Sequence, residues 1–299
     1  MKRKASSLSL IVSILFLIVT FICTTYTFSY AEKSFLWRVQ SKRSTVYILG
    51  SIHLLKKDIY PLSRTIENAF EKSDYLAVEA DINEIGRLNI QKLMESAFYS
   101  GNDTLEKHVS RSTFDTIKEQ TERLGLPVEF VYNQKPWFLG LTLSSVELMK
   151  AGYDSNYGMD KYFLSKAAGT KKILELESLD YQIDLLSSLN DDEQELFLLY
   201  TLKDLKILTQ EVDNLVEAWQ SGAVESMEKT VTKSFTEDRR FSGIYDKLIN
   251  KRNRSMALKI EGFLKTNGTC FVVVGAAHLL GDRGIIQLLK GRGYSVEQL

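Results

Sequence analysis

Two apolar runs, Thr45-Val-Tyr-Ile-Leu49 and Cys270-Phe-Val-Val-Val274, decide how this sequence folds. The first leads into Gly50-Ser-Ile-His53-Leu-Leu55 and the second into Gly275-Ala-Ala-His278-Leu-Leu280, so Gly-x-x-His-Leu-Leu occurs twice. Short runs of β-branched and aromatic residues predict buried strands. A glycine after a strand permits a tight turn, and ligand crevices in open α/β sheets form at the carboxyl ends of strands. We therefore expect both histidines to face a crevice.

Strand and helix patterns alternate around these two runs. A short polar connection, Ser41–Ser44, joins the run at residue 45 to an earlier strand pattern and predicts an antiparallel hairpin. The pattern predicts an α/β fold, with a central mixed β-sheet region flanked by helices and a large helical insertion. The other expected strands are Phe35–Gln40, Tyr75–Val78, Lys171–Leu176 and Tyr294–Val296, and the expected helical regions are Pro61–Glu71, Leu88–Ala168, Asp191–Leu264 and Gly284–Leu289.

Composition excludes several classes of protein. The chain has 299 residues, with 38 Lys+Arg against 38 Asp+Glu and 44% hydrophobic residues, values close to the average for a folded soluble protein. Disorder and collagen-like repeats are therefore excluded. The zero net charge gives no basic excess, so we expect no nucleic-acid partner. With only 2 Cys, the chain has no disulfide framework.

The first 31 residues differ from the rest of the chain. Lys2, Arg3 and Lys4 precede the apolar run Leu8–Cys23, and Ser29-Tyr-Ala31 offers small residues at a cleavage site. This pattern predicts a signal peptide. The alternative is an uncleaved membrane anchor, because the uncharged residues Thr24–Tyr30 extend the apolar run. We expect residues 32–299 to form a single extracytoplasmic domain, secreted or anchored to the outer face of the cytoplasmic membrane.

Acidic residues also follow apolar strand patterns. Glu79 comes directly after Tyr75–Val78, and Glu175 and Glu177 lie at the end of the run that starts at Lys171. Burying an unpaired carboxylate is costly, so such an acid is often compensated by a cation, a metal or hydrogen bonds. The alternative is that the strand ends at the surface and water solvates the carboxylate, above all for Glu175. Two imidazoles with carboxylates suit zinc, manganese, cobalt or iron, and a bound metal with a spare carboxylate can hydrolyse a substrate.

These motifs resemble the TraB/GumN family, which includes the pheromone-shutdown proteins and the Tiki metalloproteases. The resemblance extends from Trp37 to Leu299. It implies a sheet flanked by helices, of the erythromycin esterase and ChaN-like type, with both Gly-x-x-His motifs and the Glu of Val-Glu-Ala-Asp at one site. It also implies a manganese or cobalt enzyme related to membrane-anchored proteases. Besides the two histidine motifs and Glu79, the matching residues are Tyr157-Gly-Met-Asp160, Leu176-Glu-Ser178, Gln182, Arg252-Asn253, Met256, Gly284 and Gly293-Tyr294.

The candidate residues take different roles. We predict that His53 and His278 are metal ligands and that Glu79 is a ligand or a general base. Glu177 is a second carboxylate candidate, or simply the residue that starts a helix. The remaining candidates, Asp160, Arg252 and Asn253, would hydrogen-bond to the ligands or orient the substrate, although Arg252 could equally pair with an acid on a neighbouring helix.

For four further residues we expect positions without a functional role. Arg283 is expected in a solvated loop, Trp137 and Tyr153 in the core, and His108 on the surface among polar neighbours.

These observations predict an exported metal-dependent hydrolase, a peptidase that cuts an extracytoplasmic peptide or protein with a divalent Mn, Co or Zn ion. A non-catalytic protein of the same fold that sequesters a peptide or a haem-like ligand is the alternative. A structural membrane-associated protein is a third interpretation, in which the histidines serve stability alone.

Overall fold

The computed structural model describes residues 33–82, 90–237 and 239–299, so the predicted signal or anchor segment lies outside the described residues. Six strands form one mixed sheet in the order β4-β3-β5-β2-β1-β6. Strands β4, β3, β5 and β2 run parallel, whereas β1 is antiparallel to both β2 and β6. The strands are β1 (Leu36–Gln40), β2 (Ser44–Ser51), β3 (Tyr75–Val78), β4 (Lys172–Glu175), β5 (Gly268–Gly275) and β6 (Ser295–Gln298).

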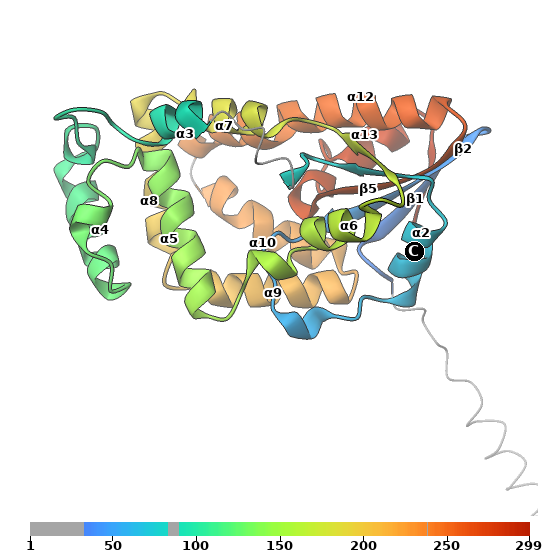
Figure 1. Ribbon diagram of the computed structural model, residues 1–299, viewed down its shortest axis with the longest axis horizontal. Helices are drawn as coiled ribbons and strands as arrows, with labels where there is room; N and C mark the ends of the chain where they lie inside the picture. The colour runs from blue at the N-terminus through green and yellow to red at the C-terminus, as the bar shows by residue number, and fades with distance from the viewer. Residues whose placement is uncertain (1–32, 83–89, 238) are drawn as a thin grey trace, which may run out of the picture. The chain divides into compact units, whose positions relative to one another are not determined.

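Helices cover both faces of the sheet (Figure 1). On one face, the rings of Phe70 in α2 (Arg64–Glu71) and Phe163 in α6 (Met159–Ala167) lie 5.5 and 4.9 Å from the ring of Phe271 in β5. On the other, α12 (Lys251–Lys265) packs on β2 and on α13 (Ile285–Gly291). A strand covered on both faces has no polar side, which explains why β5 reads as an uninterrupted apolar run.

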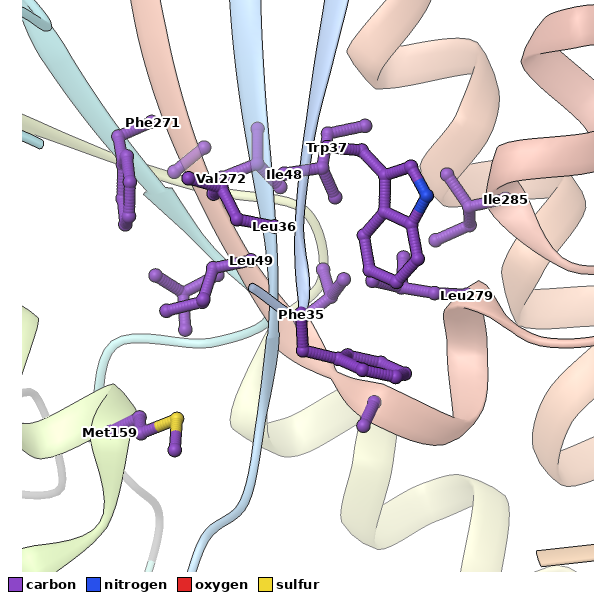
Figure 2. Close-up of a cluster of buried hydrophobic side chains, with 14 of the residues drawn as sticks. Phe35, Leu36, Trp37, Ile48, Leu49, Met159, Phe271, Val272, Leu279 and Ile285 are labelled. Carbon is purple, nitrogen blue, oxygen red and sulfur yellow. The ribbon is translucent and has the colours of Figure 1, made fainter. Parts of the chain in front are cut away.

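The core continues into the segment that carries the second histidine. Leu279 lies in a short 3₁₀ helix, η8 (Ala276–Leu279), and packs in the same buried cluster as Trp37 and Ile285 (Figure 2). Because Leu279 is anchored in this cluster, the neighbouring His278 is held close to the end of β5.

A second buried cluster lies outside the sheet, among α4, α5 and α8. This region is the predicted helical insertion, and the predicted α/β class and hairpin are confirmed. The long helical pattern that starts at Asp191 also breaks at residues 205–207, which the sequence pattern did not indicate. The helices of this region are α3 (Ile90–Ala97), α4 (Arg111–Arg123), α5 (Pro136–Lys150), α7 (Leu179–Ser187), α8 (Asp191–Asp204), α9 (Leu208–Gln220), α10 (Val224–Glu237), α11 (Ser242–Tyr245) and the π-helix η7 (Asp246–Asn250).

Within the described part of the chain, none of the helices combines the length and apolar character needed to cross a membrane.

Candidate functional site

The predicted site residues follow the carboxyl ends of four adjacent parallel strands. His53 follows β2, Glu79 follows β3, Glu177 follows β4 and His278 follows β5. Parallel strands end at the same edge of a sheet, so their following residues gather there. Both histidines were expected just after the carboxyl ends of strands, and both lie at this edge of the sheet.

Gly275 marks the point where three of these side chains meet. A Cβ atom built on Gly275 would lie 3.2 Å from Glu79 Oε1, 3.5 Å from His53 Nε2 and 3.6 Å from His278 Cδ2. The amide of Gly275 also donates to Glu79 Oε1 over 2.6 Å. A side chain at position 275 would therefore occupy the space between the two imidazoles and the carboxylate, which is why the Gly-x-x-His motif needs its glycine here.

Asp160 orients the ring of His53. Its Oδ2 atom lies 2.7 Å from His53 Nδ1, and Ser51 Oγ donates to its other oxygen over 3.2 Å. With Nδ1 protonated by this contact, Nε2 is the nitrogen that faces Gly275. The negative charge of Asp160 raises the pKa of His53 above its ordinary value. The His53 side chain is 60% exposed, so the site opens to solvent on this side.

Asn253 orients the ring of His278 in the same way. Its amide nitrogen donates to the carbonyl of Arg283 over 2.9 Å, which leaves Oδ1 to accept from His278 Nδ1 over 2.6 Å. The Nε2 lone pair of His278 therefore faces Glu79 Oε1, 3.8 Å away. Burial lowers the pKa of His278 to about 4, so this imidazole is neutral at physiological pH.

Arg252 binds two buried carboxylates at once. Its Nη2 atom donates to Glu79 over 2.6 Å and to Glu177 over 2.7 Å, and its Nε atom donates to both Glu177 oxygens over 3.0 Å. Gln182 Nε2 also reaches both carboxylates, at 3.2 Å each. Among the described residues, Arg252 therefore pairs with acids that follow strands and not with an acid on a neighbouring helix, and one of these acids is the candidate ligand Glu79.

These contacts keep Glu79 ionised. Burial alone would raise its pKa, but His278 (in acid, where its ring is protonated), the charges of His53 and Arg252, and the Gly275 amide lower the pKa of Glu79 to about 2. Each carboxylate oxygen has a definite partner, since Oε1 accepts from Gly275 and Oε2 accepts from Arg252 and Gln182. A fixed anion thus stands beside two imidazole nitrogens.

The two imidazoles and the carboxylate of Glu79 are donor groups of the kind that bind divalent metal ions. Two imidazoles present Nε2 while their Nδ1 atoms are held by Asp160 and Asn253, which is the usual arrangement around metal-binding histidines. Among the described residues, however, no three His, Cys, Asp or Glu side chains are already gathered closely enough to hold an ion. The assignment of His53, His278 and Glu79 as ligands therefore stays a prediction.

Gly158 allows the loop of His53 to approach α6. A Cβ atom at Gly158 would lie 2.2 Å from the backbone oxygen of His53. The next residue, Met159, donates its amide to the carbonyl of Ile52 over 3.2 Å, and Asp160 follows in the first turn of α6. The Tyr-Gly-Met-Asp motif thus places the carboxylate that holds His53.

Three residues at or near the site were missed or interpreted differently from sequence. Gln182 matched the family motif but had no predicted role, and it bridges Glu79 and Glu177. Glu177 does not start a helix, because Ser178 caps α7 and the Glu177 side chain turns to Arg252. Glu175 is not left to water alone, since its Oε1 accepts the amide of Asp81.

The four residues for which no functional role was expected lie apart from the site, except for the backbone of Arg283. Trp137 and Tyr153 are buried, as expected for core residues, and the Arg283 side chain is exposed beside Asp246. His108 is more enclosed than a surface residue. Its ring stacks on Tyr99 with centroids 4.2 Å apart and lies 2.9 Å from Asp103 and 3.3 Å from Asp191.

The contacts of His108 with Asp103 and Asp191 stabilise the fold in a way that depends on pH. Burial lowers the pKa of His108, but the hydrogen bonds and charges of Asp103 and Asp191 together outweigh it and raise the pKa above its ordinary value. A raised folded-state pKa means that the stabilisation is complete below the unfolded value of 6.5 and is lost as the pH rises through the folded value. We expect His108→Asn to be less stable than the native chain in mildly acidic buffer and the difference to shrink in alkaline buffer. Urea unfolding across this pH range measures it, and a constant difference would contradict the expectation.

The comparisons with known proteins agree with the motifs. The TraB/PrgY/gumN family model matches residues 35–298. The uncharacterized protein YbaP of Escherichia coli (strain K12) is 24% identical over 245 residues, which cover 82% of this chain and 87% of YbaP. Metalloprotease TIKI2 of Danio rerio is 21% identical over 315 residues, covering 88% of this chain and 60% of TIKI2. The metalloprotease TIKI homolog of Nematostella vectensis is 22% identical, covering 88% of this chain and 66% of the homolog.

No solved structure matches the chain. The family model covers nearly all of the described residues. The chain therefore belongs to the TraB/PrgY/gumN family.

Proposed function

We propose that the protein is a metal-dependent peptidase that acts outside the cytoplasm. The observation that supports this most strongly is the meeting of His53 Nε2, His278 and Glu79 Oε1 around Gly275. The similarity to metalloproteases of the TIKI type supports the same reaction class.

In this proposal His53 and His278 would hold a divalent Mn, Co or Zn ion through Nε2. When bound, such an ion polarises a carbonyl group and lowers the pKa of a water molecule. Asp160 and Asn253 keep the two rings in the required orientation. Glu79 is either the third ligand or the acceptor of the water's proton, since its Oε1 atom stands beside both rings.

Arg252 and Gln182 act on Glu79 from the opposite side. Because both donate to Oε2, they fix the carboxylate with Oε1 toward the imidazoles. Glu177 balances the charge of Arg252 and is itself almost fully buried. The solvent-facing side of His53 is the open side, where a peptide bond can approach.

The proposal is tested by digesting a peptide library with the purified mature chain. We expect cleavage when manganese, cobalt or zinc is added and none after chelation. His53→Ala should abolish the metal-dependent cleavage, because one of two imidazole ligands is lost. The matched control is His108→Ala, which removes an imidazole from the helical region and should leave the cleavage rate unchanged.

Tight retention of a peptide or of haem, with no turnover under any metal, would instead support the sequestering protein. If His53→Ala and His278→Ala lower stability without changing metal or ligand affinity, a purely structural role explains the site and the peptidase proposal fails.

Export is a separate part of the proposal and rests on the pattern in residues 1–31. A cleaved signal peptide gives a chain that begins at Glu32, which mass spectrometry of the protein purified from culture measures directly. Recovery of the intact first segment in the membrane fraction would indicate an anchor. Retention of the protein in the cytoplasm would contradict both.

A further inference from the structure

A side chain from far along the sequence holds the carbonyl of Gly50 near the end of β2. Trp219, in α9, donates from its indole Nε1 atom to this oxygen over 2.6 Å. The antiparallel pairing of β1 with β2 ends at Leu49, so the Gly50 carbonyl lies beyond the last pair, although the Gly50 amide still donates to the carbonyl of Phe35 over 3.1 Å. Gly50 and Trp219 are both buried, so water cannot easily replace the indole as donor.

Gly50 opens the motif that ends in His53. Its carbonyl and the amide of Ser51 belong to one planar peptide group, so they can only rotate together. The hydroxyl of Ser51 donates to Asp160, whose other oxygen lies 2.7 Å from His53 Nδ1. The contact from Trp219 therefore fixes the backbone that carries both His53 and a donor to the carboxylate that orients it.

The same peptide lies close to the second histidine motif. A Cβ atom at Gly50 would lie 2.5 Å from the ring of Phe35 and 3.2 Å from Cα of Ala276, which lies between Gly275 and His278. Phe35 itself is packed in the buried cluster of the sheet (Figure 2). A displacement of the Gly50 peptide would therefore change the spacing between the two histidine motifs.

The end of α9 that carries Trp219 is tied to the sheet. Gln298, in β6, donates to the carbonyl of Gly222 just beyond this helix over 2.8 Å. Helix α9 also contacts the far end of the His53 loop, where Lys56 Nζ donates to Asp213 over 3.0 Å. Both of those side chains are partly open to solvent, so that ion pair contributes little. The buried contact of Trp219 is the stronger of the two.

We propose that Trp219 is a positioning residue, which sets the place of His53 through the Gly50 peptide. The inference rests on the proposed peptidase function and deepens it, because it names a residue that places one of the candidate metal ligands. Trp219 lies 169 residues from Gly50 and belongs to none of the motifs that predicted the site.

A second tryptophan offers a matched control. Trp137 is also buried, and its Nε1 atom donates to the carbonyl of Ser96 in the helical insertion over 3.1 Å. Trp219→Phe and Trp137→Phe each remove one such hydrogen bond, and urea unfolding should show a loss of stability in both. We expect only Trp219→Phe to bind cobalt more weakly, by about tenfold, the lower end of the loss seen when groups that orient metal ligands are removed. A visible absorption titration measures this, and equal cobalt affinities of the two variants would overturn the proposal.

The second measurement needs neither metal nor a change in packing. Replacing the indole of Trp219 with benzothiophene keeps the shape of the ring system and removes its N–H donor. The chain has 3 His, so proton NMR of the metal-free protein gives three imidazole Cε1–H signals, and His53→Ala identifies the signal of His53. We expect the His53 signal to shift in the benzothiophene variant while the His108 signal stays in place. An unchanged His53 signal would mean that the indole N–H serves stability alone.

The two proposals fail in different ways. Cobalt binding that weakens only in Trp219→Phe, without cleavage of any peptide by the native chain, refutes the peptidase function and supports the role of Trp219. Metal-dependent cleavage with native cobalt affinity in Trp219→Phe does the reverse. If the native chain binds no cobalt, manganese or zinc, the peptidase proposal fails and the His53 signal alone decides the role of Trp219.

Discussion

Replacing Arg252 with methionine lowers the free energy of unfolding by about 3–5 kcal/mol, the cost of breaking a buried ion pair by removing one partner. The side chain of Arg252 is 12% exposed, and those of Glu79 and Glu177 are 9% and 3% exposed. Without Arg252, two neighbouring carboxylates stay buried with Gln182 as their remaining shared donor. Urea unfolding at neutral pH measures the loss.

The same substitution at Arg283 is the control. Arg283 is 69% exposed, and its contact with Asp246 is 3.6 Å long, so Arg283→Met should change the free energy of unfolding by less than about 0.5 kcal/mol. The backbone carbonyl of Arg283, which accepts from Asn253, is kept. Equal losses for the two variants would show that the buried network contributes nothing specific.

A second substitution separates charge from packing. Adding Glu177→Gln to Arg252→Met removes one of the two unpaired negative charges, so the double variant should recover part of the stability lost by Arg252→Met. The difference from additivity in this cycle is the coupling between the two side chains, expected between about 0.5 and 3 kcal/mol for residues in one network. The proposed peptidase activity should not return, because Glu79 Oε2 has lost Arg252 and keeps only Gln182 as a donor.

The central fold could be predicted because its strands are buried on both faces. Residues 271–274 are fully buried, so the sequence there has no polar positions, and the strand is visible as a continuous apolar run. Its parallel partner β2 could be predicted for the same reason, and it too ends close to a glycine. Short edge strands such as β4 carry a weaker signal, since exposed Lys172 and Glu175 interrupt the run.

The histidines could be located for the same reason, because each follows a recognisable strand. Their partners could not all be assigned. Arg252 and Glu79 are 173 residues apart, and only the packing of α12 beside the sheet shows which acid the arginine binds. Gln182 is one polar residue on a helix, and its contact with two carboxylates depends on how α7 leaves β4.

His108 shows where a prediction from neighbouring residues in the sequence fails. Its sequence neighbours are polar, which predicts a surface position, but Tyr99 and Asp191 approach it from other parts of the chain. Local sequence reports the neighbours along the chain, whereas the environment of a side chain depends on neighbours in space. The same reasoning applies to Asp160, which reaches His53 from 107 residues away.

Replacing Gly158 with alanine should reduce the proposed peptidase activity about 100-fold, because displacing the candidate ligand His53 by roughly 1 Å is enough for a loss of this size. The new Cβ would lie 2.2 Å from the backbone oxygen of His53, a distance that no contact tolerates. Both atoms are close to the main chain, so no rotation of a side chain relieves the overlap. The loop of His53 must move away from α6, and the contact with Asp160 stretches.

Gly262→Ala is the matched control, since Gly262 lies inside α12 with nothing within 4 Å of an added Cβ. It should raise the free energy of unfolding by about 0.5–1 kcal/mol, the usual gain of alanine over glycine in a helix, and leave activity unchanged. Gly158→Ala should also bind cobalt more weakly, which a visible absorption titration measures. Native cobalt affinity and activity in Gly158→Ala would mean that the position of His53 does not depend on its contact with α6.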